Sequence, residues 1–159
     1  MSKVEDINAD DLRDLYRELI LDHARKPRHF GKLEGATHTA QGINPLCGDK
    51  LHLYLQLDDA GTICDAKFEG SGCAISVASA SLLTDSVIGL DKTDALHRFE
   101  EVTSCLTSEA DQVDETIELG KLRALEGVRA YPARVKCATL AWHALRSAID
   151  QRKSSASTE

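Results

Sequence analysis

The sequence predicts an α+β domain in which a small antiparallel sheet of about three strands carries helices on one face. One observation is a two-residue alternation of apolar and polar side chains over residues 51–57, "LHLYLQL", which is typical of a half-buried strand. Another is the helical spacing of apolar residues before this stretch and again from residue 73 to the end of the last predicted helix. The 159 residues suffice for one domain with its own hydrophobic core. We expect a single domain over residues 1–152.

The first predicted helix starts at Asn8, a suitable N-cap, and ends before Pro27. Acidic residues occupy its first turn, where their negative charge interacts favourably with the positive end of the helix dipole. One apolar face is predicted from helical spacing, consisting of Leu12, Leu15, Tyr16, Leu19 and Ile20.

Three segments predict the sheet. Apolar and polar side chains alternate weakly over residues 36–42, which predicts a short strand. The alternation is strongest over residues 51–57, which predicts a second strand. The turn "DDAG" (58–61) then leads into a return strand over residues 62–70, "TICDAKFEG". On that strand Cys64, Ala66 and Phe68 are expected to share the buried face.

Three helices are predicted in the second half of the chain. One spans residues 73–88, and another begins near Thr93 or Asp94, either of which suits an N-cap. The last runs from Pro132 to about residue 152, with its buried face expected at Val135, Ala138, Trp142, Leu145 and Ile149. The acidic stretch 108–118 is expected to be solvated, and the tail 153–159 to be disordered.

The net charge of the chain limits the classes of partner that we expect it to bind. A formal net charge of −7 argues against nucleic acid or an anionic membrane, since both attract cationic surfaces. No apolar run is long enough to cross a bilayer, and "MSKVEDINADDL" lacks the apolar segment of a signal peptide. We therefore expect a cytoplasmic protein.

Five cysteines in a reducing compartment argue against a disulfide framework. Cys64 and Cys105 lie in apolar patterns and are expected in the core. Cys47, Cys73 and Cys137 instead lie near turn residues or helix starts, where the thiolate form is favoured. With Asp49 they would supply four ligands, which suits tetrahedral zinc or an iron–sulfur cluster. Their wide spacing leaves open whether they share one site.

Four blocks of the chain carry a family resemblance. They are "LYRELILDHARKPRHFG", "NPLCGDK", "GSGCAISVASASLL" and "YPARVKCATLAWHAL". Together they resemble the iron–sulfur cluster assembly proteins of the IscU/NifU N-terminal type, and most closely the SufU branch. The resemblance implies an IscU/SufE-like α+β fold, metal ligands at Cys47, Asp49, Cys73 and Cys137, and a cysteine desulfurase of the SufS type as partner.

Three departures from the IscU pattern favour the SufU branch. Lys136 stands where IscU proteins have a histidine, "YPARVK" replaces their chaperone-recognition segment, and the stretch between Cys73 and Cys137 is longer. The resemblance then implies a zinc-dependent sulfurtransferase. In that mechanism a histidine of the desulfurase replaces one cysteine on zinc, and the freed thiolate accepts persulfide sulfur. By resemblance Cys47 is the acceptor, and Arg134 is expected to assist it.

Two other functions are compatible with the same ligands. One is a scaffold that binds iron, assembles a [2Fe–2S] cluster and delivers it to apo-proteins. The other is a structural zinc module without chemistry, although such sites more often use only Cys and His. SUF scaffold proteins are expected downstream of a sulfurtransferase. His23 and His29 are interpreted as structural and left out of the ligand set.

Overall fold

The computed structural model describes residues 9–45, 47–107, 120–129, 131–150 and 156–157. Its elements follow the predicted order of a helix, a group of strands and then helices. Their bounds are α1 (Ala9–Arg25), β1 (His38–Asn44), β2 (Asp49–Leu57), β3 (Ile63–Ser71), α2 (Ala74–Val87), α3 (Lys92–Thr107), the 3₁₀ helix η3 (Gly120–Val128), α4 (Pro132–Ile149) and β4 (Ala156–Ser157). Within these described parts, every helix is too short or too polar to cross a bilayer.

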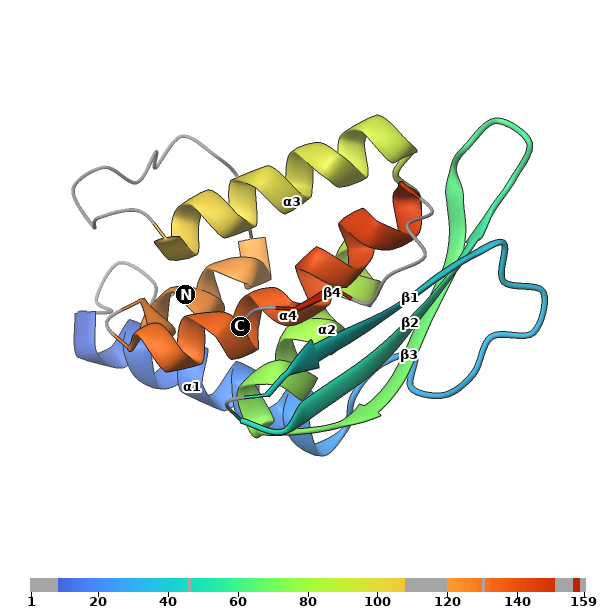
Figure 1. The fold of residues 1–159 in the computed structure, drawn as a ribbon. Helices are drawn as coiled ribbons and strands as arrows, with labels where there is room; N and C mark the ends of the chain where they lie inside the picture. The colour runs from blue at the N-terminus through green and yellow to red at the C-terminus, as the bar shows by residue number, and fades with distance from the viewer. Residues whose placement is uncertain (1–8, 46, 108–119, 130, 151–155, 158–159) are drawn as a thin grey trace.

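The sheet has the strand order β3-β2-β1-β4, and β1, β2 and β3 pair antiparallel. Helices α4 and α2 pack on one face of it, and α1, η3 and α3 pack against these two helices from outside (Figure 1). The predicted antiparallel sheet with helices on one face is confirmed. The tail differs from its predicted disorder at Ala156 and Ser157, which pair in parallel with Gly42 and Ile43 at the edge of β1.

The alternation on β2 points its four leucines into the core as predicted. The prediction for Cys64 on β3 was wrong, because this residue is exposed. Gln56 pairs with Asp65 but Leu57 pairs with Ile63, so Cys64 is the extra residue of a β-bulge. The bulge turns Ile63 inward in place of Cys64, whose thiol donates instead to the backbone oxygen of Gln56 at 3.2 Å.

The apolar face of α1 is narrower than predicted. Ile20 is buried, Tyr16 and Leu19 are half-buried, and Leu15 is 54% exposed. Among the described elements, α2 and η3 make the main contacts with this helix, and they leave the side chain of Leu15 largely exposed. Asn8 and the side chain of Leu12, which were also part of this prediction, lie outside the described residues.

The start of α3 corrects the predicted N-cap. Asp91, and neither Thr93 nor Asp94, precedes the helix and accepts the backbone N–H of Asp94 on its Oδ1 at 2.8 Å. The helix ends at Thr107, and the acidic stretch expected to be solvated lies outside the described residues.

Helix α4 begins with Pro132 at its N-terminus and buries most of its predicted face. Val135 is the exception and is half-buried. The indole of Trp142 donates to the hydroxyl of Ser79 on α2 at 3.1 Å, and this hydroxyl donates to the carbonyl of Ala138 at 2.5 Å. These bonds fix α2 against α4 inside the core.

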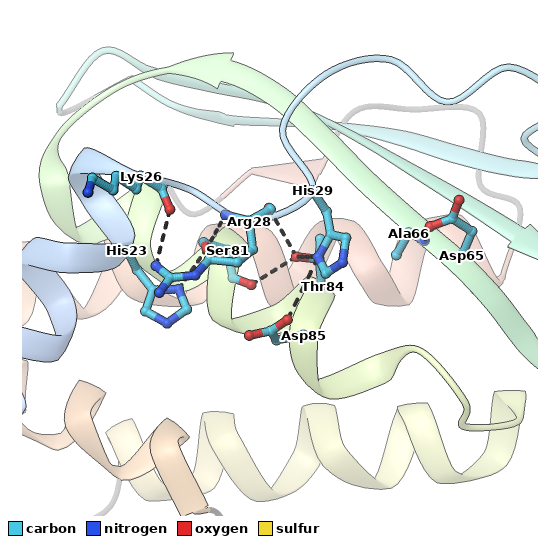
Figure 2. Close-up of polar contacts among 9 residues, drawn as sticks. All are labelled: His23, Lys26, Arg28, His29, Asp65, Ala66, Ser81, Thr84 and Asp85. Atoms are coloured by element: carbon cyan, nitrogen blue, oxygen red, sulfur yellow. Dashed lines mark hydrogen bonds and ion pairs between the residues drawn. The ribbon is translucent and has the colours of Figure 1, made fainter.

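A polar network fastens the segment after α1 to the middle of α2 (Figure 2). His23 is 1% exposed, and its Nδ1 lies 2.7 Å from the hydroxyl of Ser81. The same hydroxyl accepts the backbone N–H of Arg28 at 2.8 Å, while His29 Nδ1 lies 3.1 Å from the hydroxyl of Thr84. The network explains why both histidines are structural, as interpreted from the sequence.

Ser81→Ala should test the strength of this network. The substitution leaves the buried Nδ1 of His23 and the amide of Arg28 without their partner, so we expect a loss of about 1–3 kcal/mol in the free energy of unfolding. Urea unfolding measures it. Asp22→Ala is the control, because it removes only the exposed ion pair with Arg28 and should cost no more than about 1 kcal/mol. Equal losses of unfolding free energy in the two variants would show that Ser81 stabilises the fold no more than the exposed ion pair does.

The pH dependence of stability should report the burial of His23. Burial lowers the pKa of His23 from its usual value, and Nε2 is buried without a partner among the described residues. The unfolded chain therefore binds this proton at a higher pH, and stability should fall as the pH drops through about 6.5. In His23→Gln the fall should be smaller but not absent, since the pKa of His143 is also lowered by burial. Urea midpoints measured across this pH range for both proteins would reveal identical slopes if the prediction is wrong.

Candidate metal centre

Three separate segments of the chain meet at one end of the domain. Cys47 lies in the turn between β1 and β2, and Asp49 is the first residue of β2. Cys73 is the N-cap of α2, and Cys137 lies in the second turn of α4. The β1–β2 pairing and the packing of α2 and α4 on the sheet bring these positions together.

Three of the four side chains form a tight cluster. Ligand atoms of Cys47, Asp49 and Cys137 all lie within 4.8 Å of one another, and the two sulfurs are 3.2 Å apart. Cys73 lies beside this group, with its sulfur 4.0 Å from Asp49 Oδ2. The structure thus brings all four sequence-predicted residues to one place, with Cys73 at its margin. Their role as ligands stays a prediction.

The cluster is buried on one side and open on the other. Asp49 and Cys137 are fully buried, Cys73 is half-buried, and Cys47 is exposed. Gly48 directly follows Cys47 with a φ of 71°, a left-handed conformation that favours glycine and closes the turn sharply. Cys47 is therefore the thiol that solvent or a partner reaches first.

The carboxylate of Asp49 is held by two donors. Its Oδ1 accepts the backbone N–H of Cys73 at 2.9 Å, and its Oδ2 accepts the side-chain amide of Asn44 at 3.4 Å. Gly72 makes the first bond accessible, because a Cβ at this position would collide with the Asp49 carboxylate. These contacts offset part of the cost of burying a carboxylate.

Burial raises the pKa of the Cys137 thiol well above its ordinary value, and hydrogen bonds with Cys47, Asp49 and Cys73 act in the same direction. Without a metal this thiol keeps its proton at neutral pH and donates to the sulfur of Cys47. Only the deprotonated sulfur is a metal ligand, so metal binding at Cys137 releases a proton.

The donor chemistry of the cluster selects among metals. Thiolates with one carboxylate suit zinc or iron–sulfur clusters, whereas magnesium and calcium prefer all-oxygen sites. Four donors also match the tetrahedral preference of zinc. The residues present therefore fit a thiophilic metal.

Arg134, expected to assist the reaction, lies exposed in the first turn of α4. Among the described residues its side chain makes no hydrogen bond to the cluster. It lines a groove of about 780 Å³ together with Tyr16 and Ile20 of α1 and Ala74 of α2. Ala74 directly follows Cys73 in the chain, but none of the four cluster residues lines this groove.

The remaining cysteines lie outside the cluster. Cys105 is buried in the core, as predicted. Its sulfur lies 3.3 Å from a carboxylate oxygen of Glu126 and 3.7 Å from the guanidinium of Arg129. Cys64 is held at its bulge on β3. Neither belongs to a metal-type group among the described residues.

Sequence reasoning missed Asn44, which is fully buried and whose amide lies 3.5 Å from the sulfur of Cys137. The available signal was its position in "NPLCGD", where a polar residue precedes a candidate ligand. A strand-ending asparagine gave no reason to expect a buried side chain, and only the β1–β2 register places it opposite Asp49.

Comparison with known proteins yields one family and several close relatives. The NifU-like N-terminal domain family matches residues 15–155. The zinc-dependent sulfurtransferase SufU of Bacillus subtilis is 41% identical over 138 residues, which cover 87% of this chain and 91% of that protein. The iron–sulfur cluster assembly scaffold protein IscU of Thermotoga maritima is 44% identical over 140 residues, covering 85% and 92%. The crystal structure of FiSufU from Fervidobacterium islandicum AW-1 superposes with a TM-score of 0.76 at 36% identity, covering 83% and 94%.

Gly72→Ala should weaken metal binding. The added Cβ would displace the carboxylate of Asp49 and also lie 2.9 Å from the hydroxyl of Ser76. We expect Zn²⁺ affinity, measured by competition with a chromophoric chelator, to fall by about 10- to 100-fold, the usual effect of disturbing groups that orient ligands. Gly127→Ala is the matched control, because a Cβ there meets no atom within 4 Å. Wild-type affinity in Gly72→Ala would show that Asp49 does not need this close approach.

Proposed function

We propose a function from one premise, that this chain belongs to the NifU-like N-terminal domain family. It acts in iron–sulfur cluster assembly, and within that process it is a zinc-dependent sulfurtransferase. Its substrate is the sulfane sulfur of a persulfide on a cysteine desulfurase of the SufS type, whose turnover it stimulates. The sulfur acceptor is Cys47.

The observation that carries this proposal is the asymmetry of the two contacting thiols. Cys137 is fully buried and Cys47 is exposed, although their sulfurs are 3.2 Å apart. A purely structural metal site gains nothing from an exposed, glycine-hinged ligand. An acceptor must meet a sulfur atom held by another protein, and Cys47 occupies the side of the cluster where this is feasible.

The resident metal in this proposal is zinc, held by Cys47, Asp49, Cys73 and Cys137. Zinc keeps coordinated thiols deprotonated at neutral pH and lowers their nucleophilicity while they are bound. Three thiolates and one carboxylate carry four negative charges, which exceed the charge of the ion. Arg134 and Lys136 supply positive charge within the three residues of α4 that precede Cys137.

The transfer is a thiol–persulfide exchange. The free thiolate of Cys47 attacks the terminal sulfur of the desulfurase persulfide, and a new sulfur–sulfur bond forms on Cys47. The sulfur–sulfur bond of the desulfurase breaks, and its cysteine leaves as a thiolate with the electron pair. No external oxidant or reductant is needed. Arg134 assists by attracting the anionic persulfide toward the cluster, and SUF scaffold proteins receive the sulfur downstream.

A second candidate is a scaffold that assembles a [2Fe–2S] cluster on the same side chains. The 44% identity to a protein named as an IscU scaffold supports it, and thiolate ligands suit such a cluster. Lys136 weighs against it, since it replaces the histidine that scaffold relatives carry before the last cysteine. The sulfurtransferase is therefore the preferred function.

Elemental analysis of protein purified without oxygen should separate the two functions. For a sulfurtransferase we expect about one zinc per chain, with negligible iron and acid-labile sulfide, because the site offers four donors for one tetrahedral ion. Iron with a matching amount of sulfide would instead support the scaffold. Protein that is well folded but binds neither metal would contradict both.

Cys47→Ala should abolish stimulation of a SufS-type desulfurase and the appearance of a persulfide on this chain. The variant lacks the nucleophile, so the rate of sulfide release should return to that of the desulfurase alone. Asp49→Ala should reduce stimulation by weakening zinc. Cys64→Ala is the matched control, since it removes another exposed thiol that lies outside the cluster. Undiminished stimulation by both Cys47→Ala and Asp49→Ala would refute the mechanism.

A further inference from the structure

Asn44 contacts two residues of the cluster without being a metal-type ligand. It is the last residue of β1, and its side chain is fully buried. Its amide nitrogen lies 3.4 Å from Asp49 Oδ2 and 3.5 Å from the sulfur of Cys137. Both neighbours are acceptors in the metal-binding state, and this fixes the orientation of the amide with nitrogen toward them.

The backbone of Asn44 also supports the turn that carries Cys47. Asn44 pairs directly with Asp49 across the β1–β2 ladder, and its carbonyl accepts the backbone N–H of Cys47 at 3.3 Å. The side-chain oxygen Oδ1, in contrast, is buried with no hydrogen-bond partner among the described residues. Leaving a buried polar atom unpaired costs about 1–3 kcal/mol. An apolar side chain would avoid that cost but would also remove a donor from the buried carboxylate of Asp49, so the asparagine is explained by its contacts with Asp49 and Cys137.

The side-chain contact of Asn44 distinguishes the thiol of Cys137 from those of Cys47 and Cys73. An N–H···S hydrogen bond withdraws charge from a bound thiolate and holds its sulfur in place. Cys137 receives this bond and is buried. Cys47 and Cys73 receive no side-chain N–H among the described residues, and of these two Cys47 is exposed whereas Cys73 is half-buried. The ligand that is least restrained and most accessible is thus the one in the glycine-hinged turn.

We propose that Asn44 is a positioning residue that retains Asp49 and Cys137 in the ligand set and so makes Cys47 the ligand that is released for sulfur transfer. This inference rests on the proposed function and deepens it. Asn44 touches neither the desulfurase nor the incoming sulfur. It acts through the order in which the cysteines leave the metal.

The test uses the zinc-loaded full chain and two variants. Asn44→Leu removes the donor with similar volume, and Asn44→Asp keeps the shape but replaces the donor with an acceptor. Gln41→Leu is the matched control, because it removes a carboxamide from the exposed face of the same strand. Each protein is treated with a limiting amount of iodoacetamide, and the alkylated cysteines are identified by mass spectrometry of peptides. Zn²⁺ affinity is measured in parallel by chelator competition.

In the wild type and in Gln41→Leu, Cys47 should be alkylated well before Cys137. In both Asn44 variants the ratio of Cys47 to Cys137 alkylation should fall by about tenfold or more, and Zn²⁺ affinity should fall by about 10- to 100-fold. A wild-type ratio and wild-type affinity in both variants would overturn the inference. Failure of both variants to fold, judged by circular dichroism, would also overturn it, because Asn44 would then be a determinant of the fold.

These measurements, together with the persulfide assay described for the proposed function, distinguish this inference from that function. If the wild-type chain takes up no zinc, or Cys47 accepts no sulfur from the desulfurase, the proposed function fails regardless of the variants. If the wild type does both and the Asn44 variants keep the wild-type alkylation ratio and the wild-type Zn²⁺ affinity, only the role of Asn44 fails.

Discussion

The hydrogen bonding of the buried Asp49 carboxylate is the interaction on which the rest of the site depends. A carboxylate removed from water is costly unless donors or cations surround it. Here the donors come from β1 through the side chain of Asn44 and from α2 through the backbone of Cys73. The strand register, the close approach at Gly72 and the N-terminus of α2 must all be correct for this to occur. One side chain therefore ties the sheet to the helical layer at the place where the thiols converge.

Much of the fold was predictable because local pattern and burial agree in it. The leucines of β2 alternate, and Trp142 lies at helical spacing on a face that the core does bury. Prediction failed where a long-range contact overrides the local period. The bulge in the β2–β3 pairing exposes Cys64, and the described elements that pack on α1 leave Leu15 exposed, yet neither outcome can be read from the residues themselves. The α3 cap was misplaced by only a few residues, because several adjacent side chains could cap that helix.

The candidate site was predictable only in part. Spacing left open whether the three cysteines meet, and the family resemblance chose the four residues that the structure places together. The contrast between exposed Cys47 and buried Cys137 could not be predicted from sequence, because it depends on which face of α4 packs against the sheet and on how open the turn between β1 and β2 is. Asn44 was missed for the same reason. The chemistry of such a site resides in these differences between similar donors more than in the ligand list.

The cluster is assembled from three segments that lie far apart in the sequence, and this spacing has a consequence during synthesis of the chain. Cys47 and Cys137 are separated by 137 − 47 = 90 residues, which a ribosome takes about 5–20 s to add. During this interval the nascent chain exposes Cys47, Asp49 and then Cys73 without the α4 residue that completes the set. A metal ion captured early would be held by an incomplete set and exchange readily. Under the proposed function, zinc loading would therefore follow translation and depend on the emergence and docking of the C-terminal helix.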